Sequence, residues 1–114
     1  MVKAAQRTIQ KDGRDLQETE FTVAVRPDDT VEAQFGLMVD MLYQWHARFG
    51  PACGRFGVRF VGTTENHEAF MKCLLTLIQQ EDPLRPLFVQ LGQVNVAFVS
   101  PEGDVLKESE LKIQ

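Results

Sequence analysis

Two cysteines and two histidines are the residues of this chain best suited to metal binding or nucleophilic chemistry: His46, Cys53, His67 and Cys73. Imidazole and thiolate are the ligands that zinc prefers, but no two of the four stand at the short interval typical of zinc modules. On one helix, His67 and Cys73 would lie about 9 Å apart along the axis and point in different directions. The sequence therefore predicts no metal site.

Cys53 and His46 could instead form a thiol–imidazole pair. A cysteine within hydrogen-bond reach of a histidine has a larger thiolate fraction and becomes a nucleophile. However, Cys53 follows a segment that reads as the end of a helix, whose negative dipole end raises the pKa of a thiol, although Arg55 opposes this effect. The favoured interpretation of Cys53 is a small loop residue, and a ligand-binding or enzymatic pocket near His46, Cys53 and Arg55 is the alternative.

Arginines form a second group of candidate binding residues. Arg55 and Arg59 alternate with apolar residues in "GRFGVRFVG", and Arg26 follows a similar stretch, so all three are expected to point away from the core. On that outer face, a guanidinium could form an ion pair with a phosphate, a carboxylate or the acidic surface of a partner protein. The competing interpretation is a sheet face that is simply solvated. Nucleic-acid binding is disfavoured by the net charge of −4 and by aromatic residues that alternate onto the opposite face.

The familiar catalytic and cofactor motifs are missing from the sequence. There is no phosphate-binding glycine loop, serine elbow or dinucleotide fingerprint, and "GPACGRFG" precedes a predicted strand instead of a helix. Trp45 reads as a core aromatic residue whose ring N–H finds a partner. We therefore expect no cofactor and find only a weak signal for an enzyme.

Composition indicates one globular domain spanning residues 1–114. The chain has 114 residues, of which 44% are hydrophobic and 25% charged. It contains no apolar run approaching the roughly 20 residues that cross a bilayer, and its N-terminus lacks the apolar core of a secretory signal. Two cysteines are too few for a disulfide scaffold, so we expect a cytoplasmic protein with reduced thiols and no membrane contact.

Asp12-Gly13 separates two stretches at the N-terminus and predicts a tight hairpin turn. If Lys11 faces Arg14, the register pairs Ile9 with Leu16, Arg7 with Glu18 and Ala4 with Phe21. The second strand is expected to end at Pro27.

Helical periodicity replaces alternation after the hairpin. From Asp29, which is expected to cap a helix, apolar residues recur at helical spacing as far as Phe49, and Gly50-Pro51 ends the helix. Alternation returns in 54–62, which predicts a strand. A second helix follows, capped by Thr64 and stopped by Asp82-Pro83. Its apolar side is wide, since it includes Met71, Leu75 and Ile78.

The C-terminal part is interpreted as strands. In residues 86–99, Gly92-Gln93 is expected to turn a hairpin that sets Leu91 against Val94, Val89 against Val96 and Leu87 against Phe98. "SPEGD" forms another turn, and 105–113 is a final, mostly polar edge strand.

The expected fold is an α+β two-layer sandwich of order ββαβαβββ, with two helices on one face of a mixed or mainly antiparallel sheet of five to six strands. Excess apolar surface on the helices favours contact with another protein. We therefore predict a small cytoplasmic accessory or regulatory protein without evident catalytic activity. It is expected to form a homodimer through the open sheet face or the apolar side of the second helix.

Overall fold

A computed structural model describes residues 2–26, 28–62, 65–79 and 85–112. In this part of the chain, five strands and three α-helices follow one another in the order ββαβααββ. The strands are β1 (Val2–Lys11), β2 (Arg14–Ala24), β3 (Cys53–Val61), β4 (Gln93–Val99) and β5 (Val105–Lys112). The helices are α1 (Val31–Phe49), α2 (His67–Gln79) and α3 (Arg85–Leu91), and a short 3₁₀ turn, η1 (Gly50–Ala52), follows α1.

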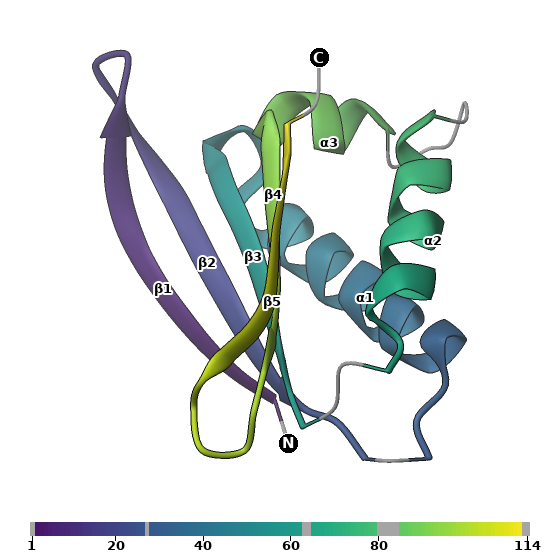
Figure 1. The fold of residues 1–114 in the computed structure, drawn as a ribbon. Coiled ribbons are helices and arrows are strands. Elements are labelled where there is room, and N and C mark those ends of the chain that lie inside the picture. The colour runs from purple at the N-terminus through teal and green to yellow at the C-terminus, as the bar shows by residue number, and fades with distance from the viewer. Residues whose placement is uncertain (1, 27, 63–64, 80–84, 113–114) are drawn as a thin grey trace.

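The strands form one sheet in the order β1-β2-β3-β4-β5. The three central strands β2, β3 and β4 run parallel, and the edge strands β1 and β5 are antiparallel to their neighbours. In Figure 1 the three helices lie on the same side of this sheet. The α+β class and the mixed five-stranded sheet agree with the prediction, whereas three helices replace the expected two and the element order differs.

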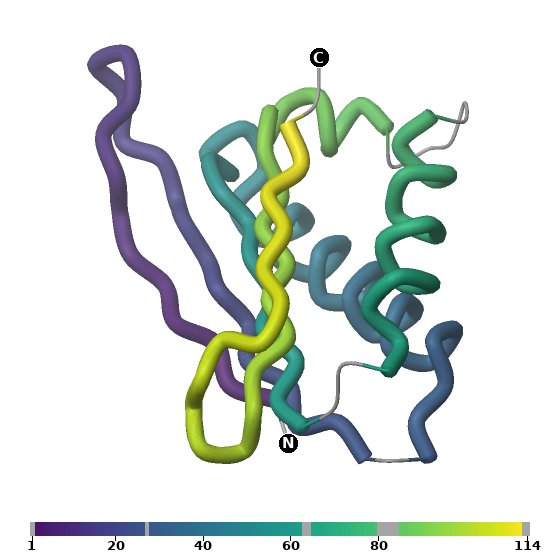
Figure 2. The backbone as a smooth tube through the Cα atoms, in the orientation of Figure 1, coloured from purple at the N-terminus to yellow at the C-terminus, as the bar shows by residue number. Residues whose placement is uncertain are grey.

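The N-terminal hairpin has the predicted turn and register. Asp12 and Gly13 both have positive φ angles, 54° and 75°, which suit a tight hairpin turn. Lys11 pairs with Arg14, and the other three predicted pairs are also present. Pairing of β2 with β3 begins only at Gln17, so the tip of the hairpin extends beyond the rest of the sheet (Figure 2).

Helix α1 begins one residue later than predicted. Thr30, in an extended conformation, is the N-cap, and its hydroxyl accepts a hydrogen bond of 3.1 Å from the Ala33 N–H. The carboxylate of Asp29 instead accepts from the backbone N–H of Arg26 at 2.8 Å and so closes the preceding loop. The predicted end of the helix is confirmed, because Gly50 has a φ of 50° and its N–H bonds to the His46 carbonyl.

Strand β3 alternates as predicted. Phe56, Val58 and Phe60 are each at most 1% exposed, and they face the helices. The C-terminal turn and the edge strand β5 are also confirmed: the Ser100 N–H bonds to the Asp104 carbonyl, and most of β5 is exposed. The predicted stops and cap at Pro27, Thr64 and Asp82-Pro83 lie outside the described residues.

Residues 85–91 form a helix, so the predicted hairpin around Gly92-Gln93 is wrong. Leu87, Phe88 and Leu91 are buried, a helical spacing, whereas Val89 is 49% exposed. A strand would have placed Leu87, Val89 and Leu91 on one face, so the exposure of Val89 fits the helix and not the strand.

The residues that bound α3 explain the error. Pro86 occupies the first turn of the helix, where a backbone N–H has no helical partner to lose. Gly92 has a φ of 72° and its N–H bonds to the Phe88 carbonyl at 3.0 Å, which is helix-end geometry. A glycine with positive φ suits both a hairpin and a helix end, so Gly92 alone does not distinguish the two structures.

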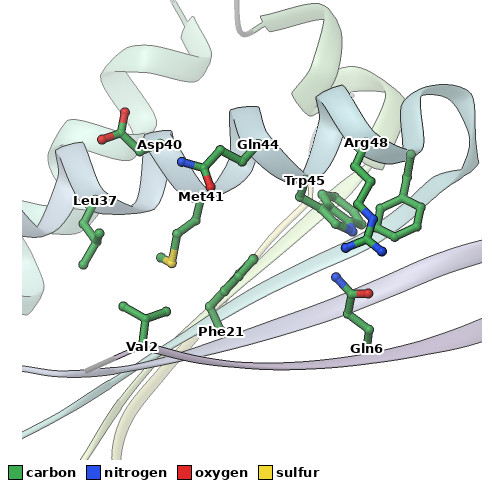
Figure 3. A pocket seen from close by; sticks show the side chains of 10 residues that line it. Val2, Gln6, Phe21, Leu37, Asp40, Met41, Gln44, Trp45 and Arg48 are labelled. Carbon is green, nitrogen blue, oxygen red and sulfur yellow. The ribbon is translucent and has the colours of Figure 1, made fainter.

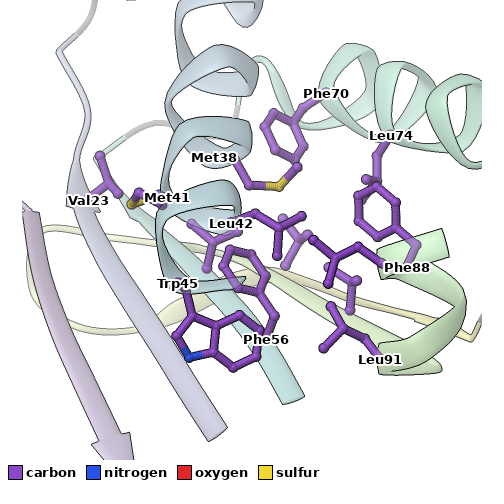
Figure 4. Close-up of a cluster of buried hydrophobic side chains, with 14 of the residues drawn as sticks. Val23, Met38, Met41, Leu42, Trp45, Phe56, Phe70, Leu74, Phe88 and Leu91 are labelled. Carbon is purple, nitrogen blue, oxygen red and sulfur yellow. The ribbon is translucent and has the colours of Figure 1, made fainter. Parts of the chain in front are cut away.

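The core lies between the sheet and the helices and contains both aliphatic and aromatic side chains (Figure 4). Phe60 packs against Phe70 and Phe98 with ring centroids 5.0 and 5.3 Å apart, and Trp45 packs against Phe56 at 5.8 Å. Each such ring buries a large apolar area, so these contacts fix α1 and α2 on the sheet.

Candidate functional site

Arg55 and Arg59 lie on β3, on the face of the sheet away from the helices, and each pairs with a glutamate of β2. Arg55 Nη1 is 3.5 Å from Glu18 Oε2, and Arg59 Nε is 3.3 Å from Glu20 Oε1. Arg7 of β1 also contacts Glu18, at 2.8 Å. The result is a band of alternating charges across three strands, in which much of each arginine's charge is already balanced.

The sequence predicted only one contact of this band, that of Glu18 with Arg7, and not the contacts of Glu18 and Glu20 with the arginines of β3. The parallel register of β2 and β3 sets Glu18 directly opposite Arg55, and Glu20 lies two positions from Thr22, the residue opposite Arg59. Alternation of two glutamates in one strand and two arginines in another was the available signal, but it becomes useful only once the two strands are known to be neighbours.

Arg26 does not join this band. It follows β2 in the loop before α1, where its side chain is exposed and its backbone N–H bonds to Asp29. The three predicted arginines therefore fall at two separate places on the surface.

Cys53 is the first residue of β3 and is buried, at 3% exposure. Its Sγ donates a weak hydrogen bond to the Trp45 carbonyl at 3.9 Å. Burial raises the pKa of the Cys53 thiol to about 11. At neutral pH this leaves on the order of one thiolate in ten thousand molecules, so the thiol is a poor nucleophile.

His46 lies half-buried near the end of α1 and makes no hydrogen bond to Cys53 within the described ranges. Arg55 points to the opposite face of the sheet, where it pairs with Glu18. The structure thus does not bring together the three residues of the predicted pocket, and none of the grooves described below includes them.

His67 at the start of α2 contacts the edge strand β5. Its Nε2 is 3.4 Å from the Ser109 hydroxyl, and its ring packs edge-on against Phe98 with centroids 5.1 Å apart. His67 therefore ties the start of α2 to the sheet.

Two grooves flank α2. One, of about 550 Å³, lies between α2 and β5 and includes Met71, Leu75 and Leu111. The other, of about 370 Å³, lies between α1 and α2 and includes Phe35 and Leu77. We call the residues that line these two grooves the α2 surface.

A third groove, of about 510 Å³, lies between α1 and the β1–β2 hairpin (Figure 3). The apolar residues that line it include Phe21, Leu37, Met41 and Trp45, and its polar residues include Gln6 and Arg48. This α1/β1 groove was not predicted, because its existence depends on β1 lying at a sheet edge that α1 does not fully cover. Trp45 is in the core as predicted, at 2% exposure, but its ring N–H has no partner among the described residues.

No cluster of three or more metal-ligating side chains occurs in residues 2–26, 28–62, 65–79 and 85–112. In the same part of the chain, no helix combines the length and apolar character that would let it cross a membrane.

No protein-family model, curated protein or solved structure matches the chain. Its function is therefore inferred from its own residues.

Proposed function

We propose that this chain is a small accessory or regulatory protein without evident catalytic activity, which acts by protein–protein contact and self-associates as a homodimer through the α2 surface. The observation that carries this proposal is Leu75, a large apolar side chain that is 42% exposed on α2. It lines the groove between α2 and β5, and a second groove runs along the other side of the same helix. Apolar surface of this kind is stabilised when a partner covers it.

A second copy of the chain suits this surface. A two-fold interface brings one patch onto itself, so the patch must be self-complementary. Lys72 lies on the α2 surface beside Glu68 and Glu110, so the patch carries both signs of charge around an apolar centre. A second copy can therefore set unlike charges against each other while it covers Leu75.

The open sheet face is the less favourable contact surface. Arg55 and Arg59 already pair with Glu18 and Glu20, so an acidic partner or a nucleic acid would have to compete with these glutamates. The predicted roles of Arg26, Arg55 and Arg59 in partner binding, and of a pocket near His46 and Cys53, stay predictions.

We also propose that the protein works in the cytoplasm. Cys53 and Cys73 are both free thiols, as a reducing compartment maintains them.

Light scattering coupled to gel filtration tests the homodimer. We expect a dimer that dissociates on dilution, and we expect Leu75→Glu to be monomeric because it places a charge in the apolar centre of the interface. Val89→Glu is the matched control, since Val89 is similarly exposed, at 49%, but lies on α3.

A wild-type chain that stays monomeric at high concentration contradicts self-association. A Val89→Glu variant that dissociates as much as Leu75→Glu contradicts the choice of the α2 surface.

A further inference from the structure

The indole nitrogen of Trp45 is a buried hydrogen-bond donor without an acceptor. Trp45 is 2% exposed, and its Nε1 has no hydrogen-bond partner among the described residues. Leaving such a group without a partner is unfavourable, and buried indole N–H groups usually have one. Trp45 also lines the α1/β1 groove, so a bound molecule could supply the missing acceptor.

Two further donors lie at the same end of the groove. Figure 3 shows Gln6, Trp45 and Arg48 together at one end. The guanidinium of Arg48 lies over the Phe49 ring, 5.2 Å from its centroid, and no carboxylate within the described ranges forms an ion pair with it. A guanidinium and an indole N–H are both donors, so an anion with oxygen acceptors fits this end.

Apolar side chains predominate at the other end of the groove. Val2, Leu37 and Met41 lie there, and Phe21 lies between the two ends (Figure 3). Val2 is 44% exposed, so this surface is open to a ligand. Asp40 also lines the groove at this end, and its carboxylate would repel a second negative charge on the ligand. The groove therefore matches a molecule with one anionic end and one hydrocarbon end.

We propose that the α1/β1 groove binds a small monocarboxylate with a hydrocarbon chain. Its carboxylate accepts hydrogen bonds from Trp45 Nε1 and Arg48, and its chain lies along Phe21, Leu37 and Met41. The volume of about 510 Å³ falls within the usual range for small-molecule sites. Because Trp45 Nε1 has almost no exposed surface, neighbouring side chains must move as the carboxylate enters, and Arg48 and Gln6, which are exposed at this end of the groove, can do so.

Trp45 is the single tryptophan of the chain, so its fluorescence reports on the groove and on the core around this one ring. The full chain is titrated with octanoate, with octanol as the neutral probe of equal length and with acetate as the carboxylate without a chain. We expect a saturable change in emission with octanoate, at least tenfold weaker binding of octanol, and no binding of acetate at the same concentrations. Each CH₂ removed between octanoate and shorter acids should weaken binding roughly fourfold.

Arg48→Gln removes the charge at the polar end and should weaken octanoate binding at least tenfold. Arg85→Gln is the matched control, because Arg85 is an exposed arginine on α3 and should leave binding unchanged. Arg48 is itself exposed, so both variants should fold, which circular dichroism checks. In a nitrogen–proton correlation spectrum, octanoate should move the single indole N–H signal downfield, as a new hydrogen bond requires.

Three results would overturn the proposal: no saturable response to octanoate, equal affinity for octanol, or unchanged affinity in Arg48→Gln. The test is independent of the homodimer, because Leu75→Glu, on the α2 surface, should bind octanoate like the unmodified chain.

Discussion

Two grooves of similar size lie between a helix and an edge strand, at the two edges of the same sheet. The α1/β1 groove has a volume of about 510 Å³, and the groove between α2 and β5 about 550 Å³. The first contains a buried indole N–H without a partner, and the second contains His67 and Ser109, whose polar atoms already lie 3.4 Å apart. The two grooves are thus similar in size but differ in whether their polar groups already have hydrogen-bond partners.

This difference indicates what each groove can bind. In the groove between α2 and β5, His67 and Ser109 already contact each other, so binding is stabilised mainly by covering apolar surface. This favours another protein over a specific small molecule. In the α1/β1 groove, the Trp45 N–H has no acceptor, so a ligand that supplies one binds more tightly. This holds only if the acceptor of the ligand lies within hydrogen-bond distance of the N–H. If the two grooves are independent, a substitution at one edge of the sheet should leave the other edge unchanged.

Removing a core aromatic ring that contacts a residue of either groove should have the largest effect. Phe98 is fully buried and contacts His67, while Phe56 contacts Trp45. Phe98→Ala and Phe56→Ala should each lower the free energy of unfolding by about 3–5 kcal/mol, measured by urea unfolding. Only Phe56→Ala should shift the Trp45 emission of the folded protein. An equal shift in Phe98→Ala would show that the two edges are coupled.

Raising the pH should destabilise the fold through Cys53, whose thiol bonds to the Trp45 carbonyl. The thiol has an ordinary pKa of 9.0, and burial raises it to about 11 in the folded chain. Between these values the unfolded chain loses the proton and the folded chain keeps it, so stability is unaffected below pH 9 and falls as the pH rises toward 11. The full loss is about 2–3 kcal/mol.

Urea unfolding at pH 8 and pH 10.5 measures this loss, with Cys53→Ala as the reference that lacks the thiol. The unmodified chain should lose more stability than Cys53→Ala between the two pH values. Equal losses would mean that the Cys53 thiol titrates alike in both states.

Removing the cap of α1 should have a smaller effect, confined to the first turn of that helix. Thr30→Ala deletes the hydroxyl that accepts from the Ala33 N–H, at a cost of about 1 kcal/mol in the free energy of unfolding. Hydrogen exchange should accelerate in the first turn of α1 and stay unchanged in α2. Thr30→Ser keeps the hydroxyl and is the control. Faster exchange throughout α2 would show that loss of the cap is felt beyond the first turn of α1.

The smallest effect is expected on the open sheet face, which borders neither groove. Glu18→Gln removes the shared partner of Arg7 and Arg55, whose side chains are 70% and 54% exposed. Exposed ion pairs contribute little, so we expect a loss below about 1 kcal/mol that shrinks in high salt. Urea unfolding at low and high salt measures it. A large, salt-independent loss would mean that this band of charges has a structural role.

Local patterns allowed the N-terminal hairpin to be predicted to the residue, because Asp12-Gly13 fixes both the turn and the register. The same reasoning failed at Gly92, because one glycine suits both a hairpin and a helix end. The burial of Leu87 and Phe88 in the tertiary fold favours the helix. Pro86 and the helical spacing of the buried residues were the signals that could have corrected it.

The candidate sites were less predictable than the elements, since each depends on elements distant in sequence. The exposed side of α2 was foreseen from its wide apolar arc, which includes Leu75. The α1/β1 groove was not foreseen, because Gln6 and Arg48 meet only after the sheet order is fixed. Trp45 was correctly placed in the core, but whether its N–H finds a partner depends on its neighbours in space.

The parallel arrangement of β2, β3 and β4 also constrains the order in which the chain folds. The β1–β2 hairpin joins residues close in sequence and can close within about 1–10 μs. Phe21 and Val58, paired across β2 and β3, are separated in sequence by the whole of α1. Because contacts between distant residues form slowly, docking of α1 should limit the folding rate, and until then the inner edge of β2 has no neighbour.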